Sequence, residues 1–318
     1  MRSFRSLLLV GLLLYANLPG PARAFEAGVF DSVVRVLPLW PGHRLGGTPG
    51  TPPGSAPEGT AVAVLAGGYL ATALHVVDQA TEITVRLGDG RQMPAELLAA
   101  DPATDVALLR IAADLPVLSM TPEPPLGTPV CAVGNQFGLG LSVTCGVVSA
   151  TRRSGVGFNP VEDFIQTDAS VNPGSSGGAL VDEQGRLVGM LSAIFTKGSD
   201  ADIGVNFAIS AALLIRVVED LAAHGRVLRA LSGFRVADLE GDGLSARAGA
   251  RVIAVQPGGA AEAAGLSPGD LVTAVAGRAV GKASDVVAAV ALHRPGDRLT
   301  LEVLRAGAAL VFELALPD

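Results

Sequence analysis

The sequence predicts a mainly β protein of two domains, in which a larger all-β domain precedes a small α+β domain. The chain has 318 residues, more than one typical domain, and its hydrophobic fraction of 49% is enough for two cores. Short apolar runs separated by turns fill residues 30–209 without alternating helices, a pattern typical of an antiparallel barrel or sandwich. Beyond residue 231, strand-like runs alternate with short helical ones, which indicates a separate α+β unit.

The first residues are typical of an export signal. Two arginines among the first five residues precede the apolar stretch Leu7–Leu18, and Ala22-Arg23-Ala24 places small residues at the cleavage positions. We therefore expect a signal peptide over residues 1–24 and an exported chain that begins near Phe25. The alternative is an uncleaved membrane anchor, but the apolar run is shorter than the roughly 20 residues that a spanning helix needs.

The elements of the first domain follow from β-branched residues and turn signals. Val33–Leu37 is predicted to be the first strand, and the Pro/Gly/Ser/Thr-rich stretch 41–59 a surface loop. Asp89-Gly90 directly follows the strand-like run at 83–87 and is a strong hairpin signal. Further short strands are expected over residues 130–133, 141–149, 186–194 and 204–209.

A helix is predicted to end the first domain. Apolar side chains recur at helical spacing from Ser210 onward, and Gly225 is placed to end the helix. We therefore divide the exported chain into domains 25–225 and 226–318. In the second domain we expect strands over 234–236 and 250–255, helices near 258–264 and 284–292, and two final strands.

Charge and metal-binding residues exclude several classes of protein. The net charge of -7 and the lack of a basic run argue against a nucleic-acid partner. The four histidines are scattered, and the two cysteines do not have the spacing of a zinc site. We therefore expect neither a metal nor another cofactor.

The two cysteines allow two interpretations. Cys131 and Cys145 lie on strand-like runs joined through the Gly-rich turn 134–140, so an antiparallel hairpin would place them opposite each other. Export would favour a disulfide between them, because exported proteins meet an oxidising environment. The alternative is a pair of buried thiols.

The stretch Gly174-Ser175-Ser176-Gly177-Gly178 has the residues of a nucleophile loop. A serine hydroxyl becomes reactive when a base removes its proton and fixed donors receive the negative charge on the attacked carbonyl. Glycines adopt backbone angles that let N–H groups converge beside such a hydroxyl. Ser176 is therefore the candidate nucleophile, against the alternative of a plain Gly/Ser turn between strands.

Two other stretches supply a candidate base and a candidate carboxylate. His75 lies at the end of an apolar strand that starts at Tyr69, and Asp105 lies at the start of the run 106–109. Each also has a structural interpretation, since a histidine can be a core residue and an aspartate can cap a turn. Asp101, which precedes a proline, is the better candidate for the turn residue.

The chain order His, Asp, Ser is that of chymotrypsin-type proteases and differs from that of subtilisins and α/β-hydrolases. The sequence resembles the HtrA/Deg family of serine proteases, in which a PDZ domain follows the protease domain. The protease motifs are Thr72-Ala73-Leu74-His75-Val76-Val77, Asp101-Pro102-Ala103-Thr104-Asp105-Val106-Ala107, Gln166-Thr167-Asp168-Ala169, Asn172-Pro173-Gly174-Ser175-Ser176-Gly177-Gly178 and Asn206-Phe207-Ala208-Ile209. The PDZ-like motifs are Gly265-Leu266-Ser267-Pro268-Gly269-Asp270 and Arg294-Pro295-Gly296-Asp297.

The resemblance implies a chymotrypsin-like double β-barrel, a PDZ domain and the roles of the catalytic residues. Ser176 would attack the peptide carbonyl, His75 would act as general base and then general acid, and Asp105 would orient the imidazole. The backbone N–H groups of Gly174 and Ser176 would form the oxyanion hole. Members of the family hold this loop inactive until it is ordered.

The resemblance also implies where the side chain before the cut would bind. The strand Leu191-Ser192-Ala193-Ile194 and the stretch Asn206-Phe207-Ala208 would surround this pocket, and neither contains an acidic residue. A buried Lys or Arg side chain would have no partner there, so small or medium aliphatic residues are expected.

In the second domain, the resemblance assigns a peptide-binding groove. The loop Leu231-Ser232-Gly233-Phe234 would bind the C-terminal carboxylate of a peptide, and Val286 and Val290 would form one wall. PDZ domains add an extended peptide to an open sheet edge. The alternative is a purely structural or oligomerisation role.

The implied function is an exported, periplasmic endopeptidase of protein quality control and the stress response. Its partners would be unfolded or damaged polypeptides and a homotrimer of the chain itself. The alternatives are a chaperone or peptide-binding protein with gated activity, and an esterase, which shares the nucleophile but not the chain order. The chain departs from the family's usual residues at Ser175, where Asn is usual, and at Ala179 and Ser210, where Pro is usual.

Overall fold

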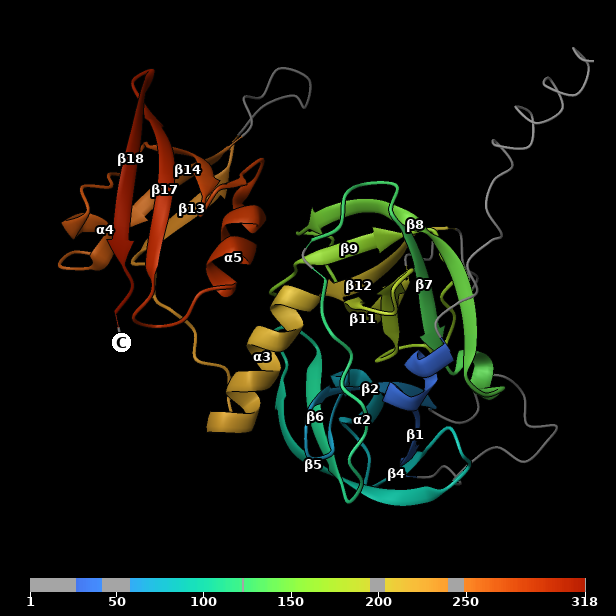
Figure 1. Ribbon diagram of the computed structural model, residues 1–318. Helices are drawn as coiled ribbons and strands as arrows, with labels where there is room; N and C mark the ends of the chain where they lie inside the picture. Colours follow the sequence, from blue (N-terminus) through green and yellow to red (C-terminus); the bar gives the residue numbers. More distant parts are fainter. Residues whose placement is uncertain (1–26, 42–57, 122, 195–203, 240–248, 318) are drawn as a thin grey trace, which may run out of the picture.

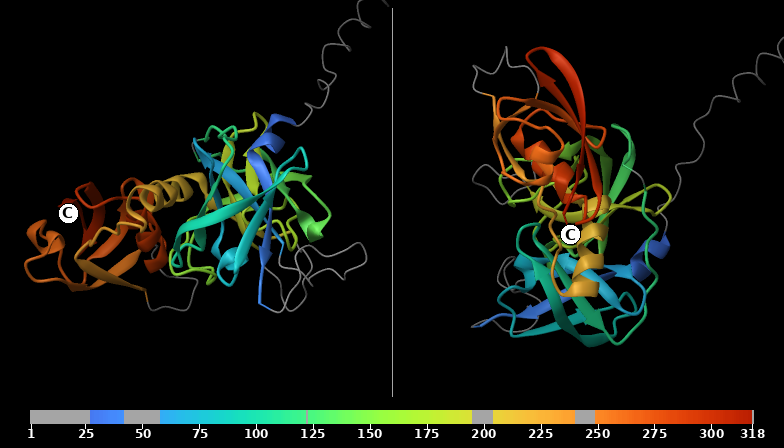
Figure 2. Two further views of the ribbon diagram at one scale, coloured as in Figure 1. Left: turned by 90° about the horizontal axis from the view of Figure 1, so that it is seen from below. Right: turned by 90° about the vertical axis from the view of Figure 1, so that its left-hand side faces the viewer.

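Two closed β-barrels and a separate C-terminal sheet make up the protein (Figure 1). The structure, a computed structural model, describes residues 27–41, 58–121, 123–194, 204–239 and 249–317. The expected signal peptide and most of the loop 41–59 lie outside these residues. The barrels lie side by side, and the C-terminal domain extends the molecule on one side (Figure 2).

Barrel 1 begins after a short 3-10 helix, Ala27–Ser32, and consists entirely of antiparallel pairs. Its first and fourth strands pair with each other and close it. In the order of the barrel, its strands are β1 (Val33–Leu39), β2 (Gly59–Leu65), β3 (Tyr69–Ala73), β6 (Val106–Ile111), β5 (Gln92–Asp101) and β4 (Glu82–Arg86).

Barrel 2 repeats this arrangement with the following strands of the chain. Its first strand, β7, pairs with both β8 and β10 and so closes the ring. In the order of the barrel, its strands are β10 (Ala179–Asp182), β11 (Leu187–Ile194), β12 (Asn206–Ser210), β9 (Phe164–Thr167), β8 (Ser142–Arg153) and β7 (Pro129–Gly134).

Continuous apolar runs form these strands because both faces of many of them are buried. In β6, Val106 and Leu108 pack in the core shared by the two barrels, whereas Ala107 and Leu109 pack inside barrel 1. The alternation follows from the two-residue period of a strand. The shared core fixes the position of one barrel relative to the other, and with it the two halves of any site between them.

Helix α3 (Ala211–His224) joins the barrels to the C-terminal domain (Figure 1). The Ser210 side chain accepts a hydrogen bond from Leu213 N at the start of the helix, and Gly225, at φ 66°, ends it. The Ser and Gly thus act as the N-cap and C-cap that the sequence predicts. The apolar face of α3 packs in the core shared by the barrels.

The C-terminal domain is a small antiparallel sheet with two helices, α4 (Ala260–Ala263) and α5 (Ala283–Ala291). Its own core lies between the sheet and the helices. The sheet order is β13 (Phe234–Asp238), β14 (Ala250–Val255), β15 (Leu271–Val275), β17 (Arg298–Arg305) and β18 (Ala308–Ala315), with β16 (Arg278–Ala279) paired to β15.

Ion pairs hold the C-terminal domain against the barrels. Arg229, just before the sheet, contacts both carboxylate oxygens of buried Asp101 at 2.7 and 2.8 Å. Arg278 of β16 pairs with buried Asp163 next to β9. Lys282 Nζ donates to the carbonyl of Ser154 at 2.5 Å.

The mainly β fold and its two barrels are confirmed, but several elements differ from the prediction. The apolar segment that ends at Val77 is a strand only to Ala73, and Leu74–Val77 forms the one-turn helix α2. The short strands β9, β10, β15 and β16 were missed because their residues are few and lack a clear period. In the part of the chain that the structure describes, no helix has both the length and the apolarity to cross a bilayer.

Candidate active site

The candidate base and its carboxylate come from neighbouring strands of barrel 1. Strand β3 pairs with β6 so that Ala73 lies opposite Val106, which brings α2 beside the residue that precedes β6. His75 Nδ1 lies 2.7 Å from Asp105 Oδ2, and His75 N donates to Asp105 Oδ1 at 2.9 Å. Leu74 N donates to the Asp105 carbonyl at 2.9 Å. Asp105 therefore fixes both the backbone and the ring of His75.

The turn before β6 places Asp105 in an uncommon backbone conformation. Asp105 has φ 59°, a left-handed angle that aspartate tolerates better than most residues. The preceding residues hold this turn, since Thr104 Oγ1 donates to Asp101 Oδ2 at 2.7 Å. Asp101 is the last residue of β5 and accepts this bond at the start of the turn, whereas Asp105 lies within the turn. Asp101 also carries the ion pair to Arg229.

The candidate nucleophile lies in a loop of barrel 2 between β9 and β10. The N–H of Gly177 donates to the Leu191 carbonyl at 2.7 Å, and the N–H of Gly178 to the Ser175 carbonyl at 2.8 Å. Barrel 1 holds the same loop through Thr60, whose N–H donates to the Ser176 carbonyl at 2.9 Å. The Thr60 hydroxyl donates to the Gly174 carbonyl at 2.7 Å. The loop is therefore held by both barrels.

Two glycines in this loop have no room for a side chain. Gly174 has φ 94°, and a Cβ there would collide with the Asn135 carbonyl oxygen. Gly177 has φ 86°, and a Cβ there would collide with the Thr60 carbonyl oxygen. Positive φ and close backbone contact together require glycine at both positions.

The two amides assigned to the oxyanion hole remain available for a ligand. Neither Gly174 N nor Ser176 N donates a hydrogen bond within the described part of the chain. The carbonyl of Pro173 accepts a hydrogen bond from Phe137 N at 2.7 Å. In a trans peptide the C=O and N–H point in opposite directions, so this bond turns the Gly174 N–H away from Phe137.

Ser176 and His75 line the same cleft, which has a volume of about 370 Å³. The Ser176 hydroxyl donates to the Ser192 carbonyl at 3.4 Å. Among the described residues, no hydrogen bond joins this hydroxyl to His75. The lining residues are Trp40, Glu58, His75, Val76, Val171, Asn172, Pro173, Gly174, Ser176 and Ser192.

The residues expected to form the specificity pocket divide between the cleft and the core. Ser192 lines the cleft, whereas Leu191 is fully buried inside barrel 2. Phe207 packs in the core, with its ring centroid 5.6 Å from that of Phe164, and is not among the described residues that line the cleft. Asn206 Nδ2 donates to the Ala169 carbonyl at 2.9 Å. The side chains of Ala193 and Ile194 lie outside what the structure describes.

Sequence reasoning missed two lining residues at the two ends of the loop 41–59. Trp40 Nε1 donates to the Val76 carbonyl at 3.2 Å, and Glu58 accepts from Asn135 Nδ2 at 2.6 Å. Burial and, secondly, the like charge of Arg86 lower the pKa of Arg35, while the nearby Glu58 carboxylate opposes this shift. The available signal for Trp40 was that it is the only tryptophan in the sequence and precedes the loop. No local motif marks Glu58.

The expected peptide-binding residues meet at the boundary between the domains. Ser232, Phe234, Val286 and Val290 line one cavity of about 440 Å³, which Leu213 and Val217 of α3 also line. Gly233 lines an adjoining cavity with Ser232 and Phe234, and its φ is 73°. The groove expected beside α5 therefore faces the barrels, and residues of α3 line its other side.

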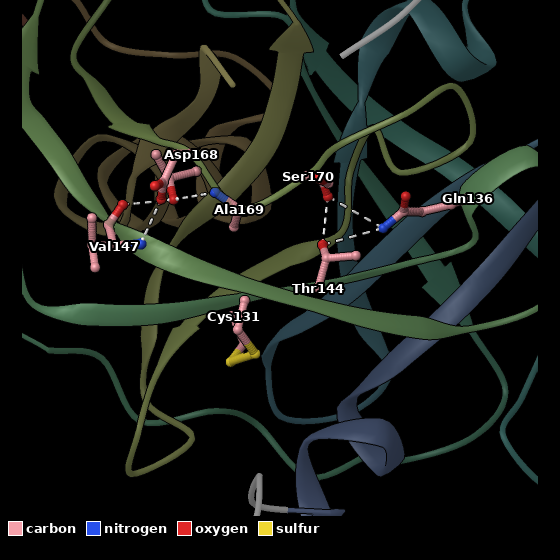
Figure 3. Close-up of a disulfide and its surroundings, with 9 residues drawn as sticks. Cys131, Gln136, Thr144, Val147, Asp168, Ala169 and Ser170 are labelled. Atoms are coloured by element: carbon pink, nitrogen blue, oxygen red, sulfur yellow. Dashed lines mark hydrogen bonds between the residues drawn. A yellow bond between two sulfur atoms is a disulfide. The ribbon is translucent and has the colours of Figure 1, made fainter. Parts of the chain in front are cut away.

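A disulfide joins Cys131 of β7 to Cys145 of β8, which lie directly opposite each other in the ladder (Figure 3). The sequence had left open whether these cysteines pair. Cys145 is exposed and Cys131 is half-buried. The disulfide therefore lies within reach of solvent, on the strand pair that leads to the 135–141 turn.

Comparison with known domain families divides the chain in two. A trypsin-like peptidase domain matches residues 59–190, and a PDZ domain matches residues 213–316.

Curated relatives share about a third of the sequence. The chain is 36% identical over 258 residues to the periplasmic pH-dependent serine endoprotease DegQ of Escherichia coli K12, covering 78% of this chain and 56% of the relative. It is 36% identical over 302 residues to a probable periplasmic serine endoprotease DegP-like of Chlamydia trachomatis, covering 91% of this chain and 60% of the relative. The chain thus spans between 56% and 60% of the length of these two proteins.

A solved structure matches almost end to end. The HtrA-type protease AlgW with a tripeptide superposes with a TM-score of 0.70 at 35% identity, covering 93% of this chain and 97% of that one.

Proposed function

The chain belongs to the HtrA-type serine proteases, and from that premise we propose that it is an exported endopeptidase that cuts unfolded or damaged proteins. The curated relatives carry names of periplasmic endoproteases, and we assign this chain to the same compartment. A cleaved signal peptide over residues 1–24 and assembly into a homotrimer complete the proposal.

Acyl transfer at Ser176 accounts for the groups in the cleft. The Ser176 hydroxyl leaves the Ser192 carbonyl, gives its proton to His75 Nε2 and attacks the peptide carbonyl. Asp105 orients the ring and stabilises the imidazolium that forms. The imidazolium then protonates the leaving amine, and a water molecule hydrolyses the acyl-enzyme by the same steps.

The negative charge on the attacked carbonyl would be stabilised by the two amides of the loop. Gly174 N–H and Ser176 N–H have no other acceptor among the described residues. Donors that are already fixed in place stabilise this charge without reorganisation. No metal or cofactor takes part in the proposed reaction.

The observation that carries the proposal is the joint placement of His75 and Ser176. Both line one cleft, although they come from different barrels, and His75 Nδ1 bonds to Asp105 at 2.7 Å. The Nδ1–H of such a ring leaves Nε2 free to act as a base. A structural histidine would not need to face a serine in an open cleft.

The cleft favours an aliphatic side chain before the cut. Ser192, Val171 and Pro173 line it near Ser176. The acidic lining residue is Glu58, which already accepts a hydrogen bond from Asn135. A lysine or arginine bound at Ser192 would find no carboxylate within residues 191–194 and 206–208, the segments expected to surround this pocket.

The PDZ domain is proposed to bind peptide C-termini. Ser232, Gly233 and Phe234 would receive the carboxylate, and Val286 and Val290 the last side chain, in the cavities where the structure groups them. Calorimetry with a peptide that ends in valine tests this role. Amidation of the peptide's C-terminus should weaken binding strongly, and equal affinities would favour a structural role.

A peptide-binding protein with silent catalysis is the second candidate. The observation in its favour is the Ser176 hydroxyl, which bonds to the Ser192 carbonyl and not to His75. In unliganded proteases such catalytic hydrogen bonds are often long or misaligned, and they tighten once substrate binds. The protease therefore remains the first candidate.

Incubation of the purified chain with unfolded casein separates the two candidates. The wild-type chain should cleave casein, whereas Ser176→Ala and His75→Ala should each lose nearly all activity, since triad members act as one unit. Ser149→Ala is the matched control, because this serine is exposed on β8 and does not line the cleft. Full turnover by Ser176→Ala would contradict the assignment, and an inactive wild type that still binds casein would favour the second candidate.

A further inference from the structure

The turn that joins β7 to β8 touches the nucleophile loop at several points. Phe137 N donates to the Pro173 carbonyl at 2.7 Å. A Cβ at Gly134 would lie 3.0 Å from Ser175 Cα, and a Cβ at Gly174 would collide with the Asn135 carbonyl. The backbones of the turn and the loop are thus in direct contact, with no side chain between them.

Gln136 connects the same turn to the loop through its side chain. Its Nε2 donates to the Ser170 carbonyl and to Thr144 Oγ1, both at 3.3 Å, and its Oε1 accepts from Asn172 Nδ2 at 2.8 Å. Gln136 is only 8% exposed. Figure 3 shows the hydrogen bonds among Gln136, Thr144 and Ser170 beside the disulfide. The side chain therefore holds two residues of the loop at once.

The disulfide adjoins the rung of the ladder that carries this network. Cys131 pairs with Cys145, and the next rung pairs Ala132 with Thr144, whose hydroxyl also donates to the Ser170 carbonyl. The covalent bond thus closes the hairpin one rung before Thr144, and Gln136 and Phe137 lie in the turn beyond the last rung, which pairs Gly134 with Ser142. A cross-link restricts the fluctuations of the segment that it closes.

We propose that the Cys131–Cys145 disulfide and the Gln136 side chain position the Gly174 oxyanion donor, so that a dithiol that opens the disulfide lowers the rate of acylation. The Phe137 N–H sets the plane of the Pro173–Gly174 peptide, and the cross-linked hairpin sets the place of Phe137. Gln136 is a positioning residue, since it touches the loop and not the substrate. The inference rests on the proposed protease function.

Opening of the disulfide is an exchange with a dithiol reductant. One thiolate of the reductant attacks Sγ of exposed Cys145, and the Cys131 sulfur leaves and takes up a proton. The second thiol of the reductant then attacks the mixed disulfide and releases the Cys145 thiol. The reductant ends as a disulfide, and both cysteines end reduced.

The test compares kcat, KM and inhibitor binding in the full exported chain. The substrate is a fluorogenic peptide with valine before the cut, and the inhibitor is the matching peptide boronic acid, whose tetrahedral adduct occupies the oxyanion hole. The peptide acid of the same sequence reports ground-state binding. The samples are the oxidised chain, the chain reduced by dithiothreitol, the Cys131→Ala/Cys145→Ala variant and Gln136→Met, which keeps the volume and removes the hydrogen bonds.

Reduction, the double cysteine variant and Gln136→Met should each lower kcat about tenfold and lower the affinity for the boronic acid by a similar factor. Small displacements of oxyanion-hole donors reduce stabilisation of the transition state by this much. KM and the affinity of the peptide acid should change less than about twofold, because oxyanion bonds form in the transition state. Gln184→Ala, in the exposed turn between β10 and β11, is the control and should keep the wild-type values.

Unchanged kcat in the folded, reduced chain would overturn the role of the disulfide, and unchanged kcat in Gln136→Met would overturn that of Gln136. A fall in kcat/KM that comes from a higher KM alone would overturn both roles. If reduction unfolds the chain, Gln136→Met decides the matter with the disulfide intact. No hydrolysis by the oxidised wild type would contradict the proposed function itself, whereas normal hydrolysis in every sample would contradict only this inference.

Discussion

The two barrels hold their shares of the candidate active site by different means. In barrel 1, His75 and Asp105 lie within two residues of paired strands, and Asp105 bonds to both the ring and the backbone N–H of His75. In barrel 2, Ser176 lies in a glycine loop that takes its shape from Thr60 of the other barrel and from the 135–138 turn. The base is held by its own strands, whereas the nucleophile depends on other segments of the chain.

This difference separates a rigid half of the site from an adjustable one. A strand pair opens only with its barrel, but a loop held by single hydrogen bonds can change shape while the barrel stays folded. The Pro173–Gly174 peptide has such a single bond, from Phe137 N. Control of the reaction is therefore expected to act on the nucleophile half.

The largest effect is expected in the rigid half, from Asp105→Asn. Asparagine tolerates the left-handed conformation at this position, so the fold should survive. In asparagine, an NH₂ group replaces the oxygen that accepts the hydrogen bond from His75 Nδ1, so the ring loses this acceptor. We therefore expect kcat for a peptide substrate to fall about 10⁴-fold. A loss below about tenfold at an unchanged melting temperature would show that His75 is not held as described.

A smaller loss of activity is expected in the adjustable half, from Gly174→Ala. The new Cβ collides with the Asn135 carbonyl and displaces the Gly174 N–H, so kcat should fall about 10² to 10³-fold. The matched control is Gly90→Ala in the β4–β5 hairpin, where φ is 89° and no atom lies within 4 Å of the added Cβ.

The two glycine variants share a positive φ but differ in their surroundings. Gly90→Ala should lower the free energy of unfolding by about 1 kcal/mol and leave kcat unchanged. Equal activity losses in the two variants would mean that strain, and not contact with the turn, explains the effect. Steady-state kinetics and thermal melting on both proteins give the answer.

The smallest effect on kcat is expected from Arg229→Ala, which removes the ion pair between the C-terminal domain and Asp101 of barrel 1. The Arg229 side chain is 43% exposed but that of Asp101 only 6%, so loss of the pair leaves a buried carboxylate and should cost about 1 to 3 kcal/mol of unfolding free energy. Asp101 keeps its bond from Thr104, and kcat should change less than about twofold. A tenfold fall in kcat would show that the base half also depends on distant contacts.

The difference between the rigid and the adjustable half of the site also explains which features could be predicted from the sequence. The first strand of barrel 1, the β4–β5 hairpin at Asp89-Gly90, the position of Asp105 directly before β6 and the caps of α3 follow from local patterns and were predicted correctly. The strand that leads to His75 ends earlier than predicted. Ser176 was chosen from its neighbouring glycines, which mark close backbone contact.

The support of the nucleophile loop was out of reach for local patterns. Gln136, Thr60 and Phe137 act through contacts that join segments far apart in the sequence, and none of them has a distinctive residue type. Phe207 was expected at the pocket, yet the alternation of β12 points it into the core beside Phe164. Register, which composition does not specify, decides which face such a residue occupies.

Amide hydrogen exchange on the oxidised and reduced chain tests the central claim most directly, because it reports the two halves of the site separately. Reduction of Cys131–Cys145 should speed exchange in residues 168–178 and leave residues 69–78 unchanged, since of these two segments the hairpin bonds to the first. Unaltered exchange in 168–178, or an equal increase in both segments, would contradict the account.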